Sequence, residues 1–166
     1  MHFQGIDIRP FLDNDNWNAL MKSPQMSNPY GLNINLAAAK KIALAAAKEA
    51  ERVKINVIIA IVDAGGHLIY LERFDKAQFG SIDVAVHKAR CSVAYKRPTK
   101  IFEEVVNSGK INLLTLADIC AVEGGLPIIH SGRIIGAIGV SGGTSQEDGK
   151  IAMAGLSALK ERIILP

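Results

Sequence analysis

Three polar side chains able to bind a ligand or move a proton share one face of a helix predicted over residues 81–95. Asp83 stands four residues before His87, and Arg90 stands three residues after it, so an acid, an imidazole and a guanidinium lie side by side on such a helix. In one interpretation Asp83 orients the ring while His87 acts as a ligand or as a general acid–base. In the other, all three belong to an ordinary solvated helix face.

The remaining side chains with catalytic potential form no familiar motif. His67 and His130 adjoin turns, and each alone is typical of a structural or surface histidine. Cys91 and Cys120 lack the spacing of metal ligands and are expected to be buried thiols. Because no Gly-x-Ser-x-Gly elbow, P-loop or His-Glu-x-x-His motif occurs, catalytic residues are not assigned and no metal site is predicted.

A second candidate site is a glycine loop between a predicted strand and a predicted helix. Gly142 and Gly143 free the backbone, and Thr144 or Ser145 can cap the helix, with an acidic residue three positions later completing a capping box. Unpaired amides at such a helix start favour carboxylates and phosphates. We interpret the loop as an anion-binding site, and the alternative is a plain strand-to-helix corner.

The elements that must position these groups follow from hydrophobic periodicity, turn residues and caps. They are a helix over 36–52 capped by Asn35, strands 57–62 and 67–73 in a hairpin, the helix 81–95, a helical turn over 99–106, strands 126–130 and 134–140 in a second hairpin, and a helix from about residue 145. Residues 111–122 are ambiguous, with part read as helix and a strand allowed near Cys120. The order predicts the α+β class, with an antiparallel sheet of about five strands flanked by helices.

Composition limits the class of protein. With 166 residues, of which 49% are hydrophobic, the chain can bury the core of one domain. No run approaches the roughly 18 uninterrupted apolar residues that span a bilayer. The net charge of +3 is spread along the sequence, so neither a membrane nor a nucleic acid is an expected partner. No secretory signal opens the chain, and a cytoplasmic location is expected.

Residues 1–31 differ from the body, which we assign to residues 32–166. This extension contains three prolines, the Asp13-Asn14-Asp15-Asn16 run and apolar residues such as Trp17, which we expect to pack on the body or on another subunit. Its Phe3-Gln4-Gly5 resembles the remnant of a cleaved tag, which leaves open whether all of it is native.

Three blocks together resemble a known family. Residues 124–148 carry the second hairpin and the glycine loop, residues 59–73 carry Val62-Asp63-Ala64-Gly65-Gly66 between two apolar strands, and residues 85–94 carry Lys88-Ala89 in the middle helix. Their order and spacing are similar to those of the haem-degrading domain family, the GlcG/HbpS-like proteins, which also include the C-terminal domain of PduO. The resemblance covers about residues 33–159.

The resemblance implies a profilin-like sandwich, with the terminal helices on one face and the middle helix on the other, and relatives that assemble into dimers or larger rings. It also implies haem as a ligand, with the iron ligand in certain members attributed to a histidine on the first helix. Here residues 36–52 contain no histidine. Either His87 or His67 takes that role, or this member does not coordinate haem iron; Lys40, Lys41 and Lys48 are then candidates to meet the propionates.

Two functions remain open at this point. The first is haem binding or haem handling, haem degradation included, by a homo-oligomer that is a dimer or larger. The second is an enzyme or binding module for a small carboxylated metabolite or cofactor, held by Arg73, His87 or Arg90 together with the amides of residues 142–145.

Overall fold

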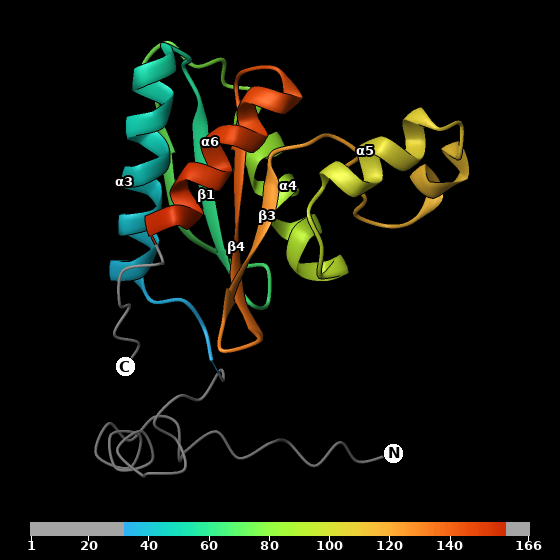
Figure 1. Ribbon diagram of the computed structural model, residues 1–166, viewed down its shortest axis with the longest axis horizontal. Helices are drawn as coiled ribbons and strands as arrows, with labels where there is room; N and C mark the ends of the chain where they lie inside the picture. Colours follow the sequence, from blue (N-terminus) through green and yellow to red (C-terminus); the bar gives the residue numbers. More distant parts are fainter. Residues whose placement is uncertain (1–31, 159–166) are drawn as a thin grey trace, which may run out of the picture. The chain divides into compact units, whose positions relative to one another are not determined.

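The described part of the chain folds into an antiparallel sheet with helices on both faces. The computed structural model describes residues 32–158. Its four strands are β1 (Ile58–Asp63), β2 (Leu68–Arg73), β3 (Gly125–His130) and β4 (Arg133–Ser141), in the spatial order β2-β1-β4-β3 (Figure 1). Both predicted hairpins are confirmed, and the sheet joins them through the β1–β4 pair, in which Ile58 lies opposite Ser141.

Two helices pack on one face of the sheet and one on the other. The helices α3 (Leu36–Val53) and α6 (Ser145–Ser157) contact each other and share one face, while α4 (Ser81–Tyr95) covers β1, β4 and β3 from the opposite face (Figure 1). This arrangement confirms the sandwich that the family resemblance implied. The shorter α5 (Lys100–Asn107) and the 3-10 helix η1 (Ile111–Thr115) extend beyond the β3 side of the sheet.

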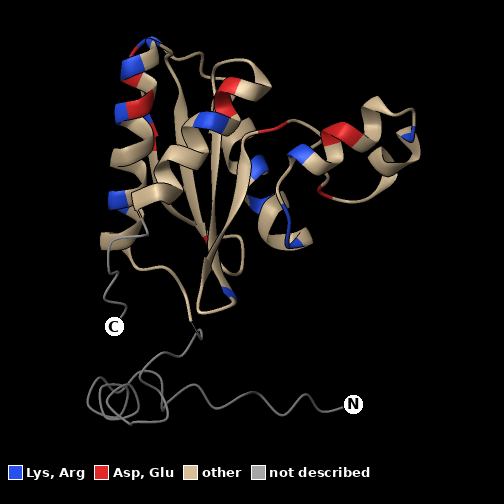
Figure 2. Ribbon diagram, viewed as in Figure 1, with Lys and Arg blue, Asp and Glu red and all other residues tan. Residues whose placement is uncertain are grey.

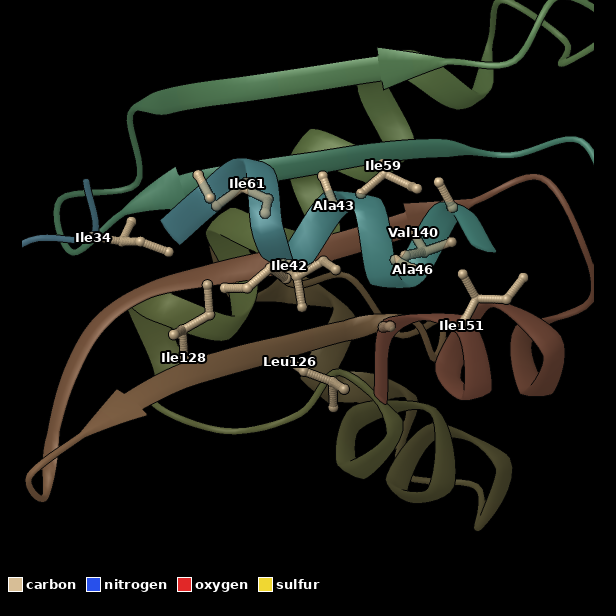
Figure 3. Close-up of a cluster of buried hydrophobic side chains, with 14 of the residues drawn as sticks. Ile34, Ile42, Ala43, Ala46, Ile59, Ile61, Leu126, Ile128, Val140 and Ile151 are labelled. Carbon is tan, nitrogen blue, oxygen red and sulfur yellow. The ribbon is translucent and has the colours of Figure 1, made fainter. Parts of the chain in front are cut away.

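The two faces of β1 explain why the layers stack in this way. Val57, Ile59 and Ile61 point into the main core, where they meet side chains from α3, α6, β3 and β4 (Figure 3). The alternate residues Ile58, Ala60 and Val62 belong to smaller clusters with α4. A strand buried on both faces reads as a continuous apolar run, which is the pattern that predicted it.

Glycine in β3 and β4 lets α4 lie directly on the sheet. A Cβ at Gly139 would stand 2.0 Å from the carbonyl oxygen of Ala85, and one at Gly125 would stand 2.3 Å from that of Lys88. Side chains at these positions would push the helix away, so glycine is required by close approach rather than by a turn.

The sheet has four strands among the described residues, and the expectation of about five is wrong. The segment around Cys120 follows η1 as a loop, and its amides bond to side chains instead of to a strand. The Cys120 amide donates to Cys91 Sγ at 3.3 Å, and the Glu123 amide donates to Glu103 Oε2 at 2.5 Å. Because these two amides already donate to side chains of α4 and α5, they are not available to pair with a neighbouring strand.

The described helices show neither a membrane-spanning segment nor a confinement of basic residues to one element. Within residues 32–158 no helix is long and apolar enough to cross a membrane. Lys and Arg residues are distributed over α3, α4, α5 and α6 (Figure 2). The expectations for residues 1–31 lie outside the described residues.

Candidate functional site

A groove runs along the exposed side of α4. One part, of about 490 Å³, is lined by Asp83, Val84, Val86, His87, Arg90 and Asp118. An adjoining part, of about 350 Å³, continues past Arg90 and Asp118 to the β1–β2 turn, where Gly65, Gly66 and His67 line it. We call these two parts together the α4 groove. Their volumes fall in the range typical of small-molecule sites.

His87 is the group in the α4 groove best placed to bind a ligand. Its side chain is half-buried, and it makes no hydrogen bond or ion pair with any residue of the 32–158 region. In particular, no hydrogen bond joins it to Asp83, which is exposed one turn earlier on the helix. Both ring nitrogens are therefore open to a ligand, since an imidazole can donate from one and coordinate or accept through the other.

Arg90 has a structural task in the same groove. Its Nε donates to the carbonyl oxygen of Gly66 at 2.9 Å, which ties α4 to the β1–β2 turn. Gly66 has a φ of 82°, a conformation that few other residues adopt, so the carbonyl is held in position. The two terminal nitrogens of Arg90 make no hydrogen bond to the described part of the chain, which leaves them for an anionic group.

His67 lies at the far end of the α4 groove. Its Nδ1 is 3.4 Å from Asp63 Oδ1, and its side chain is 81% exposed. The same carboxylate oxygen accepts hydrogen bonds from the amides of Gly65 and His67, both at 2.8 Å, so Asp63 organises the turn. This position fits a turn residue more closely than a buried ligand.

The glycine loop is already occupied by the chain's own carboxylates. The Gly143 amide donates to Asp148 Oδ1 at 2.9 Å, and the Thr144 amide donates to Glu147 Oε2 at 2.8 Å. Thr144 and Glu147 form the capping box that the sequence predicts. An external anion at these amides would have to displace Asp148 or Glu147.

The two glycines of the loop differ in what surrounds them. Gly142 has a φ of 153°, and a Cβ there would stand 2.4 Å from the carbonyl oxygen of Asn56. A Cβ at Gly143 would meet side chains and no backbone atom among its three nearest neighbours, which are Glu147 Oε2 at 2.9 Å, Glu147 Cβ at 3.1 Å and Ile55 Cγ2 at 3.2 Å. Ser145 donates its hydroxyl to Glu103 Oε1 at 2.8 Å, which ties the loop to α5.

Arg73 lies apart from both sites. It lines a separate hollow of about 610 Å³ at the end of β2, together with Lys54 and Lys76 on its rim. The predicted site residues thus divide into three places: Asp83, His87 and Arg90 meet in the α4 groove, whereas Arg73 and the 142–145 loop do not line it. Their ligand-binding roles stay predictions.

Sequence reasoning missed a buried ion pair between Lys88 and Asp148. The Lys88 ammonium donates to Asp148 Oδ2 at 2.8 Å and to the Val140 carbonyl oxygen at 3.0 Å. Burial raises the pKa of the Asp148 carboxyl, and this outweighs the opposite influence of Lys88 and of the loop amides. The available signal was spacing, because Lys88 stands in the buried stripe of Ala85, Ala89 and Ser92 on α4.

The architecture and the groove define a class: a four-stranded α+β sandwich with a ligand-sized groove along its middle helix. Comparisons with known proteins identify the family. A family model described as haem degrading protein HbpS-like matches residues 34–157, so the chain belongs to the HbpS-like family. The sequence resemblance to this family is thereby confirmed.

Three relatives illustrate the match. Protein GlcG of Escherichia coli K12 is 39% identical over 103 residues, which cover 62% of this chain and 77% of GlcG. A 15.0 kDa Citrobacter freundii protein from the dhaT–dhaS intergenic region is 35% identical over 132 residues, covering 77% and 93% of the two chains. The crystal structure of the PduOC–haem complex matches with a TM-score of 0.69 and 27% identity, over 76% of this chain and 95% of that one.

Proposed function

We propose that this protein binds haem in the α4 groove, with His87 as the ligand of the iron. The observation that carries the proposal is the half-buried imidazole of His87, which lines a ligand-sized groove and has no partner within residues 32–158. Family membership and the likeness to a protein solved with haem support the choice of ligand.

The groove residues fit the parts of a haem. A neutral imidazole is a common iron ligand. Val84 and Val86 supply apolar surface for the macrocycle, and the free terminal nitrogens of Arg90 can pair with a propionate. When bound, haem would supply a redox-active iron, and the chain's own residues would bind and orient it.

The groove is open on one side, which bears on assembly. Residues 32–158 provide the α4 wall and the Asp118 rim but no cover over the groove. A second subunit placed against α4 would supply that cover. We therefore couple haem binding to self-association into a dimer or a larger homo-oligomer.

Titration with haemin tests the proposal. The parent protein is expected to give a saturable shift of the Soret band, and His87→Ala should weaken binding by about ten-fold or more, equivalent to about 1.4 kcal/mol. Its melting temperature should stay near that of the parent, because His87 makes no bond that folding needs. His67→Ala is the matched control, since it removes a histidine from the exposed end of the same groove.

The other outcomes discriminate between the remaining functions. If the His87 ring coordinates iron, added imidazole should restore the Soret band of His87→Ala. If His87 serves only in packing, added imidazole should leave the spectrum of the variant unchanged. Absence of saturable binding by the parent would refute the haem proposal. Binding of small carboxylates that depends on Arg73 would then favour the metabolite function, for which the hollow at Arg73, Lys54 and Lys76 is the corresponding site.

A further inference from the structure

Two buried cysteines lie in direct contact where the loop around residue 120 packs on α4. The backbone amide of Cys120 donates to Cys91 Sγ at 3.3 Å, and both residues are free thiols in one apolar cluster with Phe102. Since an amide nitrogen is bonded to its own Cα, Cys91 Sγ lies within about 4.8 Å of the Cys120 Cα. At that distance a Cys120 sulfur can bond to Cys91 Sγ, because a cysteine sulfur lies two bonds from its own Cα.

We infer that Cys91 and Cys120 are a redox pair, which a peroxide converts into an intramolecular disulfide between α4 and the 116–124 loop. Neither cysteine serves in the haem site proposed above. The contact spans 29 positions in sequence, so it is a product of the tertiary fold and not of local geometry.

The chemistry is a two-electron oxidation by hydrogen peroxide. The Cys120 thiolate attacks one peroxide oxygen, the O–O bond breaks, and a sulfenic acid and one water form after proton transfer. The Cys91 thiolate then attacks the sulfenic sulfur, the S–O bond breaks, and the disulfide and a second water result. Two thiols and one hydrogen peroxide thus give one disulfide and two waters.

Burial determines the order and the pace of the two steps. Cys120 is 8% exposed while Cys91 is fully buried, so Cys120 is the residue that a peroxide reaches first. Desolvation raises the pKa of both thiols, although the Lys88 ammonium acts in the opposite direction on Cys120. Protonated thiols react slowly, so the pair responds to sustained oxidant rather than to traces.

The disulfide would fix one wall of the α4 groove. Cys91 follows His87 by one helical turn on α4, and Cys120 follows Asp118 by two residues on the opposite wall. A covalent bond between them removes the freedom of the wall to move away from the helix. The cross-link itself is independent of the haem proposal, and only its effect on haem affinity rests on that proposal.

Treatment of the folded protein with hydrogen peroxide tests the inference. The two thiols are expected to disappear together, with a mass loss of two hydrogen atoms and a cross-linked peptide containing Cys91 and Cys120. Reduction with a dithiol should restore both thiols. The matched controls separate the two roles. Cys91→Ala keeps the thiol that peroxide reaches first and should progress to sulfinic acid without any cross-link. Cys120→Ala keeps only the fully buried Cys91, which should stay reduced.

Three results would overturn the inference. They are independent oxidation of the two thiols, a cross-link between chains instead of within one chain, and retention of both thiols in the folded protein at peroxide levels that oxidise the urea-unfolded chain. The peptide analysis uses the parent sequence, so it remains decisive even where a cysteine variant fails to fold. Haemin titration of oxidised and reduced protein, done separately, shows whether the disulfide alters the groove; a disulfide without haem binding would refute only the function proposed above.

Discussion

The ammonium of Lys88 lies 2.8 Å from a carboxylate oxygen of Asp148, with side chains only 1% and 3% exposed. The pair joins α4, on one face of the sheet, to the first turn of α6, on the other. Gly124 makes room for it, because a Cβ there would stand 2.9 Å from Lys88 Nζ. Asp148 also accepts the Gly143 amide, so one carboxylate holds both the helix and the glycine loop in place.

Lys88→Met should destabilise the protein by about 3–5 kcal/mol, because it leaves the Asp148 carboxylate buried without its counter-ion. Urea unfolding measures the free energy of unfolding. The control is Lys100→Met, which breaks the exposed pair of Lys100 with Glu123 and should change the free energy of unfolding far less. An equal decrease in the free energy of unfolding of the two variants would show that the buried pair stabilises the protein no more than the exposed one.

The capping box should make stability depend on pH. The amide and hydroxyl of Thr144 donate to Glu147 and lower the pKa of its carboxyl below the ordinary 4.5. Because the folded pKa is the lower one, this stabilisation is complete above 4.5 and is lost as the pH falls through the folded pKa. Glu147→Gln should therefore be less stable than the parent at neutral pH, with the gap in melting temperature closing in acid. A gap that stays constant over this range would contradict the prediction.

Gly139→Ala should cost about 1–3 kcal/mol or more, because the new methyl group would collide with the backbone of α4. The collision involves the Ala85 carbonyl oxygen at 2.0 Å and the Ala89 nitrogen at 2.7 Å, neither of which can rotate away. Gly80→Ala is the matched control, since a Cβ at Gly80 meets no atom within 4 Å. The denaturation midpoints of the two variants should differ clearly. An unchanged midpoint for Gly139→Ala would mean that α4 does not pack on β4 as closely as described.

Self-association is expected from apolar side chains at the end of the α5–η1 extension. Ile111, Leu114 and Leu116 are 68%, 54% and 49% exposed, so large apolar groups gather outside the core. Light scattering at micromolar concentration should report a dimer or larger assembly. The double change of Ile111→Glu and Leu114→Glu should shift it toward monomer with little change in melting temperature. A monomeric parent would refute the prediction.

The strongest sequence patterns predicted the fold well. The helix expected over 36–52 forms over Leu36–Val53, and Asn35 caps it by accepting the Ala38 amide at 2.8 Å. The hairpin expected from strands 126–130 and 134–140 also forms, and it turns at Ser131 and Gly132, with φ of 48° and 75° at the two residues. Caps and tight turns are local, so a few neighbouring residues suffice to specify them.

Residues 111–122 resisted prediction for a physical reason. Apolar periodicity normally reports burial, but Ile111 and Leu114 are apolar and exposed. The spacing of these apolar residues therefore does not indicate which side of the segment faces the core. The Lys88–Asp148 pair was missed for a different reason: its members are 60 residues apart, and charge pairing at that distance depends on the packing of three layers.

The β1–β4 pair has a consequence for how the chain folds. Each hairpin closes between neighbouring segments, whereas Ile58 must find Ser141 across a long stretch of chain. Closing such a long loop costs conformational entropy. We therefore expect the two hairpins to dock late in folding, and this docking step to limit the folding rate. Backbone amides in the middle of β1 and β4 should consequently be among the slowest in the protein to exchange with deuterated solvent, since they open only when the halves separate.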